Sequence, residues 1–143
     1  MKWILVALVV STLGGAGVAF ASSLGVASSH VTVFKNTLQP TTTTTSLPVP
    51  SITAGSSAQA SASLSWSATV APGGSVTYTV YTDSGCATLF ATARTVSVSA
   101  GIVPDSPLVL FNTAGNYYWK AAYSGDGYNQ PSFDCLATPL VVN

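Results

Sequence analysis

The sequence predicts an all-β fold, an antiparallel sandwich of about seven strands. The clearest sign is the run 117–123, where Tyr117, Trp119 and Tyr123 alternate with other residues before a Ser-Gly-Asp turn. Such alternation is typical of a strand with one buried face. Composition agrees, because Val, Thr, Ser and Ala are abundant while Glu is absent and Met occurs once. Residues that build helix surfaces are therefore scarce.

Short apolar runs and turn signals follow one another from about residue 59. Strands are expected near 63–67, 76–81, 89–93 continued by 96–98, 108–111, 117–123 and 139–142. Turns are expected at 71–74, 83–85, 103–107 and 112–116, where Gly, Pro, Asp and Asn gather. No helical periodicity competes after residue 22.

Aromatic residues are expected to fill the core, because such rings supply much of the buried area of a small domain. Along 117–123 the odd-numbered positions, including Ala121, should face inward, and Tyr118, Lys120 and Ala122 should face outward. The predicted core residues are Trp66, Tyr78, Tyr117, Trp119 and Tyr123.

The chain contains two cysteines, Cys86 and Cys135. An even number in an exported chain favours a disulfide between them, with two buried free thiols or an intermolecular bridge as alternatives. No Cys-x-x-Cys spacing exists, which excludes a zinc ribbon or a thioredoxin-type site.

Residues 1–21 are predicted to be a secretory signal peptide. Lys2 precedes an apolar run, and Ala19-Phe20-Ala21 has the small residues of a cleavage site. A retained membrane anchor is the alternative, although glycines interrupt the run. The expected location is secreted or at the cell surface, with membrane contact only if this segment is kept.

Residues 22–58 are predicted to form an extended arm and a Thr/Pro-rich stalk ahead of a sandwich at 59–143. A short strand is conceivable at 31–34, where Val alternates with Thr and Phe, and it could add to a sheet edge. Prolines flank the run Thr41–Thr45, and such tracts serve as O-glycosylated stalks or as unmodified linkers.

Two stretches carry a family resemblance. One is Tyr117-x-Trp119-x-Ala121-x-Tyr123-Ser124-Gly125-Asp126, then Asn129 and Cys135; the other is Gly74-Ser75-Val76-Thr77-Tyr78-Thr79-Val80-Tyr81, followed by Cys86. Over about residues 49–143 the chain resembles the YSGD-type bacterial immunoglobulin-like domains repeated in secreted and surface proteins. The resemblance implies an immunoglobulin-like sandwich, a Cys86–Cys135 bridge and a spacer or adhesive role. Those domains usually occur in tandem, whereas this chain holds one copy.

Charge and residue types exclude several classes of function. Charged residues make up 6 % of the chain and the net charge is zero, so no basic stripe exists for nucleic acid. The lone histidine, His30, lies in the predicted arm, and a catalytic base needs a rigid setting. We therefore expect no enzyme activity, no catalytic residues and no cofactor.

Two further hypotheses concern ligand binding, one by aspartates and one by tyrosines. Asp83, Asp126 and Asp134 all fall in predicted loops and could gather a Ca²⁺ ion, although ordinary turn chemistry explains them better and no metal site is predicted. Exposed tyrosines could stack on sugar rings. The candidates are Tyr81, Tyr118 and Tyr128.

The sequence thus predicts a non-catalytic exported structural or adhesion module whose partners are other surface proteins or glycans. Two alternatives stay open. One is a filament subunit that donates the strand at 31–34 to a neighbour, and the other is a carbohydrate-binding module. The oligomeric state cannot be read from the sequence.

Overall fold

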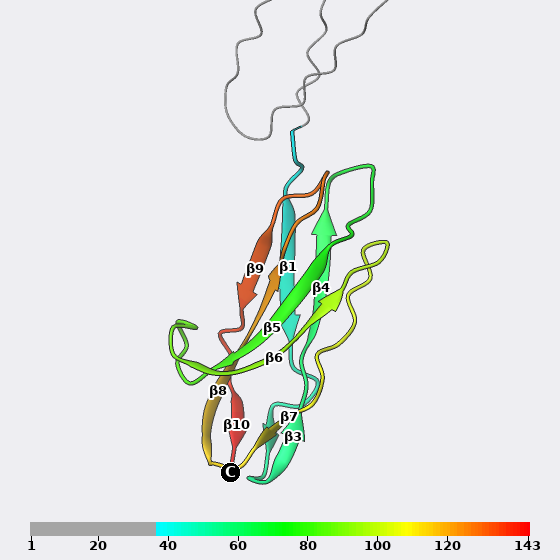
Figure 1. Cartoon of the computed structure of the whole chain (residues 1–143). Helices are drawn as coiled ribbons and strands as arrows, with labels where there is room; N and C mark the ends of the chain where they lie inside the picture. Colours follow the sequence, from blue (N-terminus) through cyan, green and yellow to red (C-terminus); the bar gives the residue numbers. More distant parts are fainter. Residues whose placement is uncertain (1–36) are drawn as a thin grey trace, which may run out of the picture. The chain divides into compact units, whose positions relative to one another are not determined.

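The computed structural model describes residues 37–143, so the predicted signal peptide, His30 and the strand expected at 31–34 lie outside the described residues (Figure 1). The described part contains strands and no helix, which confirms the all-β prediction. Its strands are β1 (Thr41–Ser46), β2 (Ser51–Ile52), β3 (Ser56–Ala58), β4 (Ser61–Trp66), β5 (Ser75–Tyr81), β6 (Leu89–Ser97), β7 (Val109–Phe111), β8 (Gly115–Tyr123), β9 (Ser132–Cys135) and β10 (Leu140–Val142).

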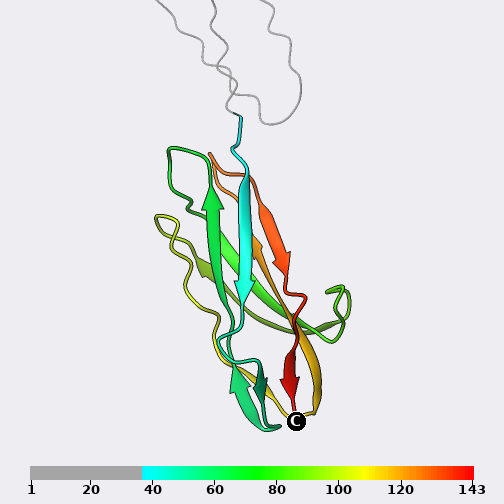
Figure 2. The same ribbon diagram turned by 180° about the vertical axis from the view of Figure 1, so that it is seen from behind.

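The strands form the two layers of a sandwich, seen from opposite sides in Figures 1 and 2. One layer is a sheet in the order β2-β10-β8-β5-β6, in which β9 also pairs with β8 beyond the end of β10. The other contains the antiparallel pairs β1–β4 and β3–β7. Ser106 N donates to Ala60 O at 2.9 Å, which ties the junction of β3 and β4 to the segment before β7.

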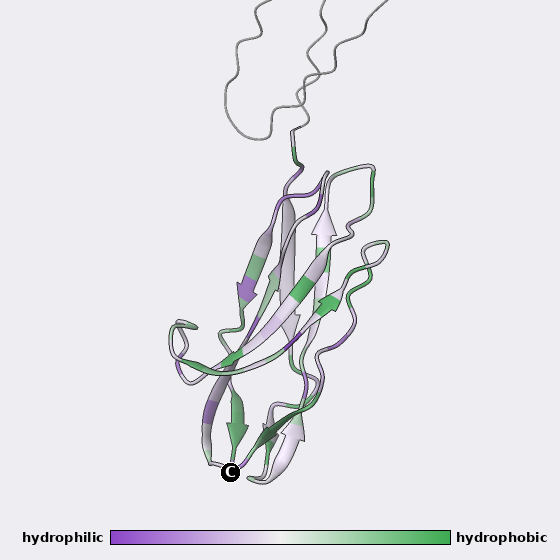
Figure 3. Cartoon of the chain, in the orientation of Figure 1, coloured by the Kyte–Doolittle hydropathy of each residue, from purple (hydrophilic) through white to green (hydrophobic). Residues whose placement is uncertain are grey.

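The core lies between the layers and follows the predicted alternation. Every second residue of β5 and of β8 from Tyr117 is buried, and the intervening residues are partly exposed. Tyr78 and Trp119 are 0 % exposed, Tyr117 5 % and Tyr123 2 %, so these four core predictions are confirmed. Figure 3 shows β10 and β7, at the end of the sandwich where the chain terminates, among the most apolar segments.

Trp66 is the exception among the predicted core residues, because it is 40 % exposed. Its partner across the sheet is Thr41, at the very end of the β1–β4 pair, where the opposite layer no longer covers it. The indole ring instead covers the turn at Gly101, where an added Cβ would lie 2.8 Å from Trp66 Cζ3. Trp66 therefore closes one end of the sandwich rather than filling its centre.

The stalk prediction is wrong from Thr41 onward, since Thr41–Ser46 is strand β1 and pairs with β4 along its full length. The sandwich thus begins near residue 41 instead of 59. Thr43 and Thr45 are 4 % and 3 % exposed, whereas Thr42 and Thr44 face solvent. Threonine suits this position because its branched side chain favours strands.

The buried side of β1 is polar and is satisfied by β9. Thr43 Oγ1 and Ser132 Oγ are 2.7 Å apart, and Thr45 N donates to Asp134 Oδ2 at 2.7 Å. Buried hydroxyl and amide groups need such partners, because an unpaired one costs about 1–3 kcal/mol. A stretch that looks like a linker by composition is therefore anchored to the sheet opposite.

Strand β6 lies at an edge of the larger sheet and contains two irregularities in its pairing with β5. Ala93 and Phe90 are the residues left without a partner. The second irregularity lies at Phe90, whose side chain is 41 % exposed; its ring stacks on Phe111 at 5.6 Å and meets Tyr117 edge-on at 4.7 Å. Bulges of this kind increase strand twist and interrupt a regular edge.

Candidate functional site

Asp126, which ends the Tyr-Ser-Gly-Asp motif, organises the loop after β8. One carboxylate oxygen accepts hydrogen bonds from Gly73 N at 2.7 Å and from Tyr123 Oη at 3.1 Å. The other accepts from Tyr128 N and Asn129 N, each at 2.8 Å. The side-chain amide of Asn129 donates to both oxygens, at 3.0 and 3.1 Å. The motif therefore has a structural role here.

These hydrogen bonds change the pKa values of Asp126 and Tyr123. The bond from Gly73 N, helped by those from Tyr128 and Asn129, holds the pKa of Asp126 well below its ordinary value. Burial and the contact with Asp126 raise the pKa of Tyr123 to about 12. A carboxylate held this firmly in its charged form, with its lone pairs occupied, is poorly suited to carry protons.

Close packing of two turns explains the glycines of this region. Gly74 has φ 75° and Gly125 has φ 73°, backbone conformations that residues with a Cβ rarely adopt. A Cβ on Gly74 would collide with Gly125 O, and one on Gly125 would lie 2.8 Å from Pro131 N. The loop before β5 and the loop after β8 are thereby locked together.

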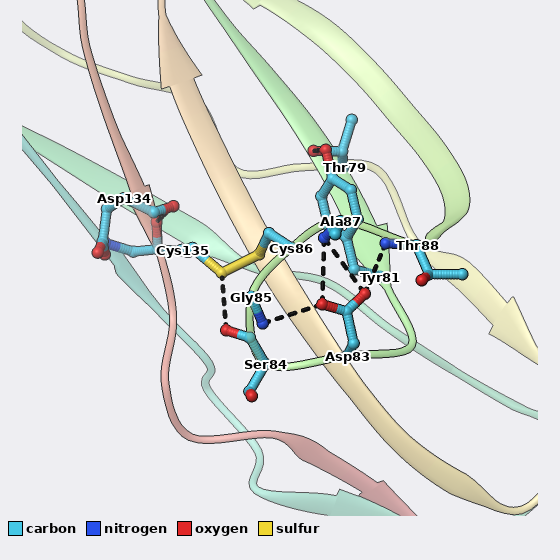
Figure 4. Close-up of a disulfide and its surroundings, with 11 residues drawn as sticks. Thr79, Tyr81, Asp83, Ser84, Gly85, Cys86, Ala87, Thr88, Asp134 and Cys135 are labelled. Carbon is cyan, nitrogen blue, oxygen red and sulfur yellow. Dashed lines mark hydrogen bonds between the residues drawn. A yellow bond between two sulfur atoms is a disulfide. The ribbon is translucent and has the colours of Figure 1, made fainter.

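The disulfide is present between Cys86 and Cys135, which confirms the predicted pairing (Figure 4). It joins the loop between β5 and β6 to the end of β9, across the strand β8 that separates them. Asp83 shapes this loop by accepting hydrogen bonds from the backbone N–H groups of Gly85, Ala87 and Thr88. The bond from Thr88 contributes most to lowering the pKa of Asp83.

The three aspartates considered for calcium are not brought together. Asp83 caps its own loop, Asp126 binds the turn before β5, and Asp134 accepts from Thr45 N. Within residues 37–143, no group of three or more His, Cys, Asp or Glu side chains is arranged to hold a metal ion. In the same part of the chain, no helix has the length and apolar character needed to cross a membrane.

The three tyrosines considered for sugar binding separate into two places. Tyr81 and Tyr118 are direct partners across β5 and β8 and are only partly exposed. Tyr128 lies in the loop after β8 and is 53 % exposed. The structure therefore does not assemble one platform of three rings, and Tyr128 is the ring open to a ligand.

A groove lies beside Tyr128, at the end of the sandwich where the described chain begins. It is an open surface depression with a volume of about 380 Å³. The side chains that border it and could contact a ligand are Thr37, Gln39, Ser67, Thr69, Val70 and Tyr128. All of them are uncharged, so the groove offers hydroxyl, amide and apolar contacts.

On one side of this groove, the Gln39 segment is tied to the Tyr128 loop by backbone hydrogen bonds. Gln39 N donates to Tyr128 O at 2.8 Å, and Gln130 N donates to Gln39 O at 2.8 Å. Beneath them, Asn129 is 0 % exposed, and its amide nitrogen lies 3.5 Å from Val70 O. The Asn129 Oδ1 atom is buried without a hydrogen-bond partner in the described structure.

Sequence analysis identified Tyr128 but missed the groove, because the groove joins segments distant along the chain. Gln39 belonged to the predicted stalk, and 67–70 was an unassigned stretch between a strand and a turn. The bridge between Gln39 and Asn129, together with hydrogen bonds of Gln130 to the Gln39 segment, brings the first segment to the Tyr128 loop. The polar residues Ser67 and Thr69 before the Pro-Gly-Gly turn were the one available signal.

No protein-family model, curated protein or solved structure matches the chain. The resemblance to immunoglobulin-like repeat domains therefore stays a prediction, while the all-β sandwich and the disulfide rest on the structure itself.

Proposed function

We propose that this chain is a non-catalytic structural or adhesion module that acts outside the cytoplasm. The observation that carries the proposal is the neutral groove with the exposed Tyr128 ring, formed by loops on a disulfide-closed sandwich. Loops fixed to a rigid scaffold are a common place for binding surfaces. The groove offers contacts for holding a partner and no charged group for transforming one.

The carboxylates of Asp126 and Asp83 support a non-catalytic role. Asp126 accepts bonds from Gly73, Tyr123, Tyr128 and Asn129, which leaves little capacity for a substrate. Asp83 is occupied in the same way by backbone groups of its own loop. General acid–base catalysis needs a group that can exchange a proton with a bound substrate.

Two observations support action outside the cytoplasm. The Cys86–Cys135 disulfide indicates an oxidising environment, since such bonds are rare in reducing compartments. The composition of residues 1–21 predicts a secretory signal. Protein in the culture medium that begins at Ser22 would agree with release, and membrane-bound protein that retains Trp3 would indicate an anchor.

The filament alternative needs a free sheet edge that accepts a donated strand. The edge at β6 is interrupted at Ala93 and Phe90. Bulges are one device by which natural proteins keep edges from pairing. This favours adhesion over strand donation at β6, and electron microscopy of the native chain would reveal filaments if they form.

A bead assay tests the adhesion proposal directly. Beads coated with the full exported chain should attach to cells of the source organism, or to the surfaces it colonises, more than albumin-coated beads do. Chain that has been reduced and alkylated at Cys86 and Cys135 serves as a matched control with a disrupted fold. Attachment no greater than that of albumin would overturn the proposal.

A further inference from the structure

We infer that the groove beside Tyr128 binds a neutral saccharide, and this inference rests on the proposed function because it names the ligand class of the same surface. It follows from three features of the groove: one open aromatic ring, several neutral hydrogen-bonding side chains, and a rigid backbone. Each feature is fixed by contacts within the described residues.

The Tyr128 ring supplies the apolar contact. Its backbone is fixed at both ends, with N donating to Asp126 Oδ1 at 2.8 Å and O accepting from Gln39 N at 2.8 Å. The ring itself stays 53 % exposed on the border of the groove. A pyranose has C–H groups on one face that pack against an aromatic surface, which suits an amphipathic ring such as tyrosine.

The polar border matches the hydroxyls of a sugar. The Gln39 amide donates one hydrogen bond to Thr37 O at 3.0 Å, and it retains a second N–H and an acceptor oxygen for a ligand. Ser67 and Thr69 add hydroxyls that donate and accept. A hydroxyl-rich ligand needs both kinds of partner to replace the water it loses.

The uncharged border of the groove is unsuited to anionic ligands, and its polar side chains are unsuited to a purely apolar ligand. Phosphate, sulfate and carboxylate ligands are recognised by arginine, lysine or clustered backbone donors, and none of the bordering side chains is charged. A purely apolar ligand would leave Gln39, Ser67 and Thr69 without partners, which costs free energy. A neutral polyhydroxylated ring needs no charged partner, and its hydroxyls can form hydrogen bonds with these three side chains.

The side of the groove formed by Tyr128 and Gln39 is also pre-organised. Asp126 fixes the Tyr128 loop through bonds to Gly73 and Asn129, and Gln130 N bonds to Gln39 O. A site whose backbone is already ordered loses little conformational entropy on binding. Weak individual sugar contacts can therefore add up to measurable affinity.

The test uses the full exported chain on a glycan array. Cellohexaose, xylohexaose, mannohexaose and maltohexaose represent polysaccharides, while an N-glycan core and O-mannosyl peptides represent glycoproteins, so the array also separates these two sources. We expect binding to at least one of these probes. Titration calorimetry with the best probe then gives the affinity for each variant.

Variants at Tyr128 distinguish stacking from general damage. Tyr128→Ala should weaken binding about tenfold, the equivalent of one aromatic stacking contact, whereas Tyr128→Phe should retain it. Phe133→Ala is the matched control, because Phe133 is 68 % exposed on β9, where Lys120 Nζ lies 4.6 Å from its ring centre, away from the groove. The melting temperature of each variant checks that the fold is kept.

Two results would overturn the inference: no binding to any probe on the array, or equal binding by Tyr128→Ala and the wild-type chain. Either result is separable from failure of the proposed function. If the beads attach to cells but the chain binds no probe on the array, the adhesion proposal is supported and only the inference of saccharide binding is rejected.

Discussion

Replacing Asp126 with alanine should lower the free energy of unfolding by about 3 kcal/mol, because three nitrogens would lose their hydrogen-bond acceptor. The carboxylate is the acceptor for Gly73 N and for both the backbone and side-chain nitrogens of Asn129. Asn129 is 0 % exposed, so its two nitrogens would be left inside the protein.

The magnitude follows from counting the donors that lose their partner. An unsatisfied buried donor costs about 1–3 kcal/mol, and we use about 1 kcal/mol for each of the three because Asp126 is at the surface and water can enter. The hydrogen bond of Tyr128 N is exposed and adds little, and the part-buried bond of Tyr123 Oη is left out of the count, so about 3 kcal/mol is a lower figure. A loss of about 3 kcal/mol should reduce the melting temperature by about 12 °C or more in a domain of this size.

Urea unfolding followed by the fluorescence of the buried Trp119 measures this change. Asp126→Asn keeps the shape and one acceptor oxygen, so it should lose less. Asp105→Ala is the control, because Asp105 is exposed and has only a 3.4 Å contact with Gln59 Nε2; it should stay within about 0.5 kcal/mol of wild type. A loss under 1 kcal/mol for Asp126→Ala would refute the reasoning.

The same residue predicts the response to acid. The pKa of Asp126 is lower in the folded chain than its ordinary value of 3.8, chiefly because Gly73 N donates to the charged form. The unfolded state therefore binds the proton more readily, and the stabilisation is present above about pH 4 and is lost as the pH falls below it. Asp126→Ala should show a shallower decline of stability between pH 4 and 2 than the wild type, measured by urea unfolding at each pH.

Three further predictions concern other contacts. Reduction of Cys86–Cys135, with a sequence separation of 49, should destabilise the fold by about 4 kcal/mol in the chain-entropy model, which urea unfolding with and without reductant checks. Burial raises the pKa of Tyr78 from 10.0 to about 12, so stability present below pH 10 should be lost towards pH 12, as ultraviolet titration and circular dichroism would show. Gly74→Ala should destabilise more than Gly55→Ala, because both have positive φ but only Gly74 has neighbours that a Cβ would meet; equal melting temperatures would contradict this.

The centre of the fold could be predicted because its signals are local. Tyr117, Trp119 and Tyr123 alternate on one strand, and the same residues are buried in the structure. The bridge between Cys86 and Cys135 followed from an even count of cysteines in a chain predicted to be exported. Alternation and cysteine count need no knowledge of the partner strands.

The predictions that failed concern residues whose positions depend on contacts between distant segments of the chain. Trp66 alternates correctly with its serines, but the sheet ends at its position, and no local pattern marks where a facing layer stops. The groove depends on Gln39 meeting the Tyr128 loop, two segments that the sequence separates widely. The Thr41–Thr45 run was predicted to be a stalk from its composition. Because its residues are identical, the sequence does not show that buried and exposed positions alternate along it.

That uniform run makes β1 unusually sensitive to changes in its length. Five identical residues contain no information on register, so residues outside the run must select the alignment with β4, among them Ser46, whose Oγ lies 2.7 Å from Ser61 Oγ. Gain or loss of two threonines would preserve which side of the strand each flanking residue occupies, whereas a change of one would reverse it. Natural variants of this tract should therefore differ by even numbers of threonines.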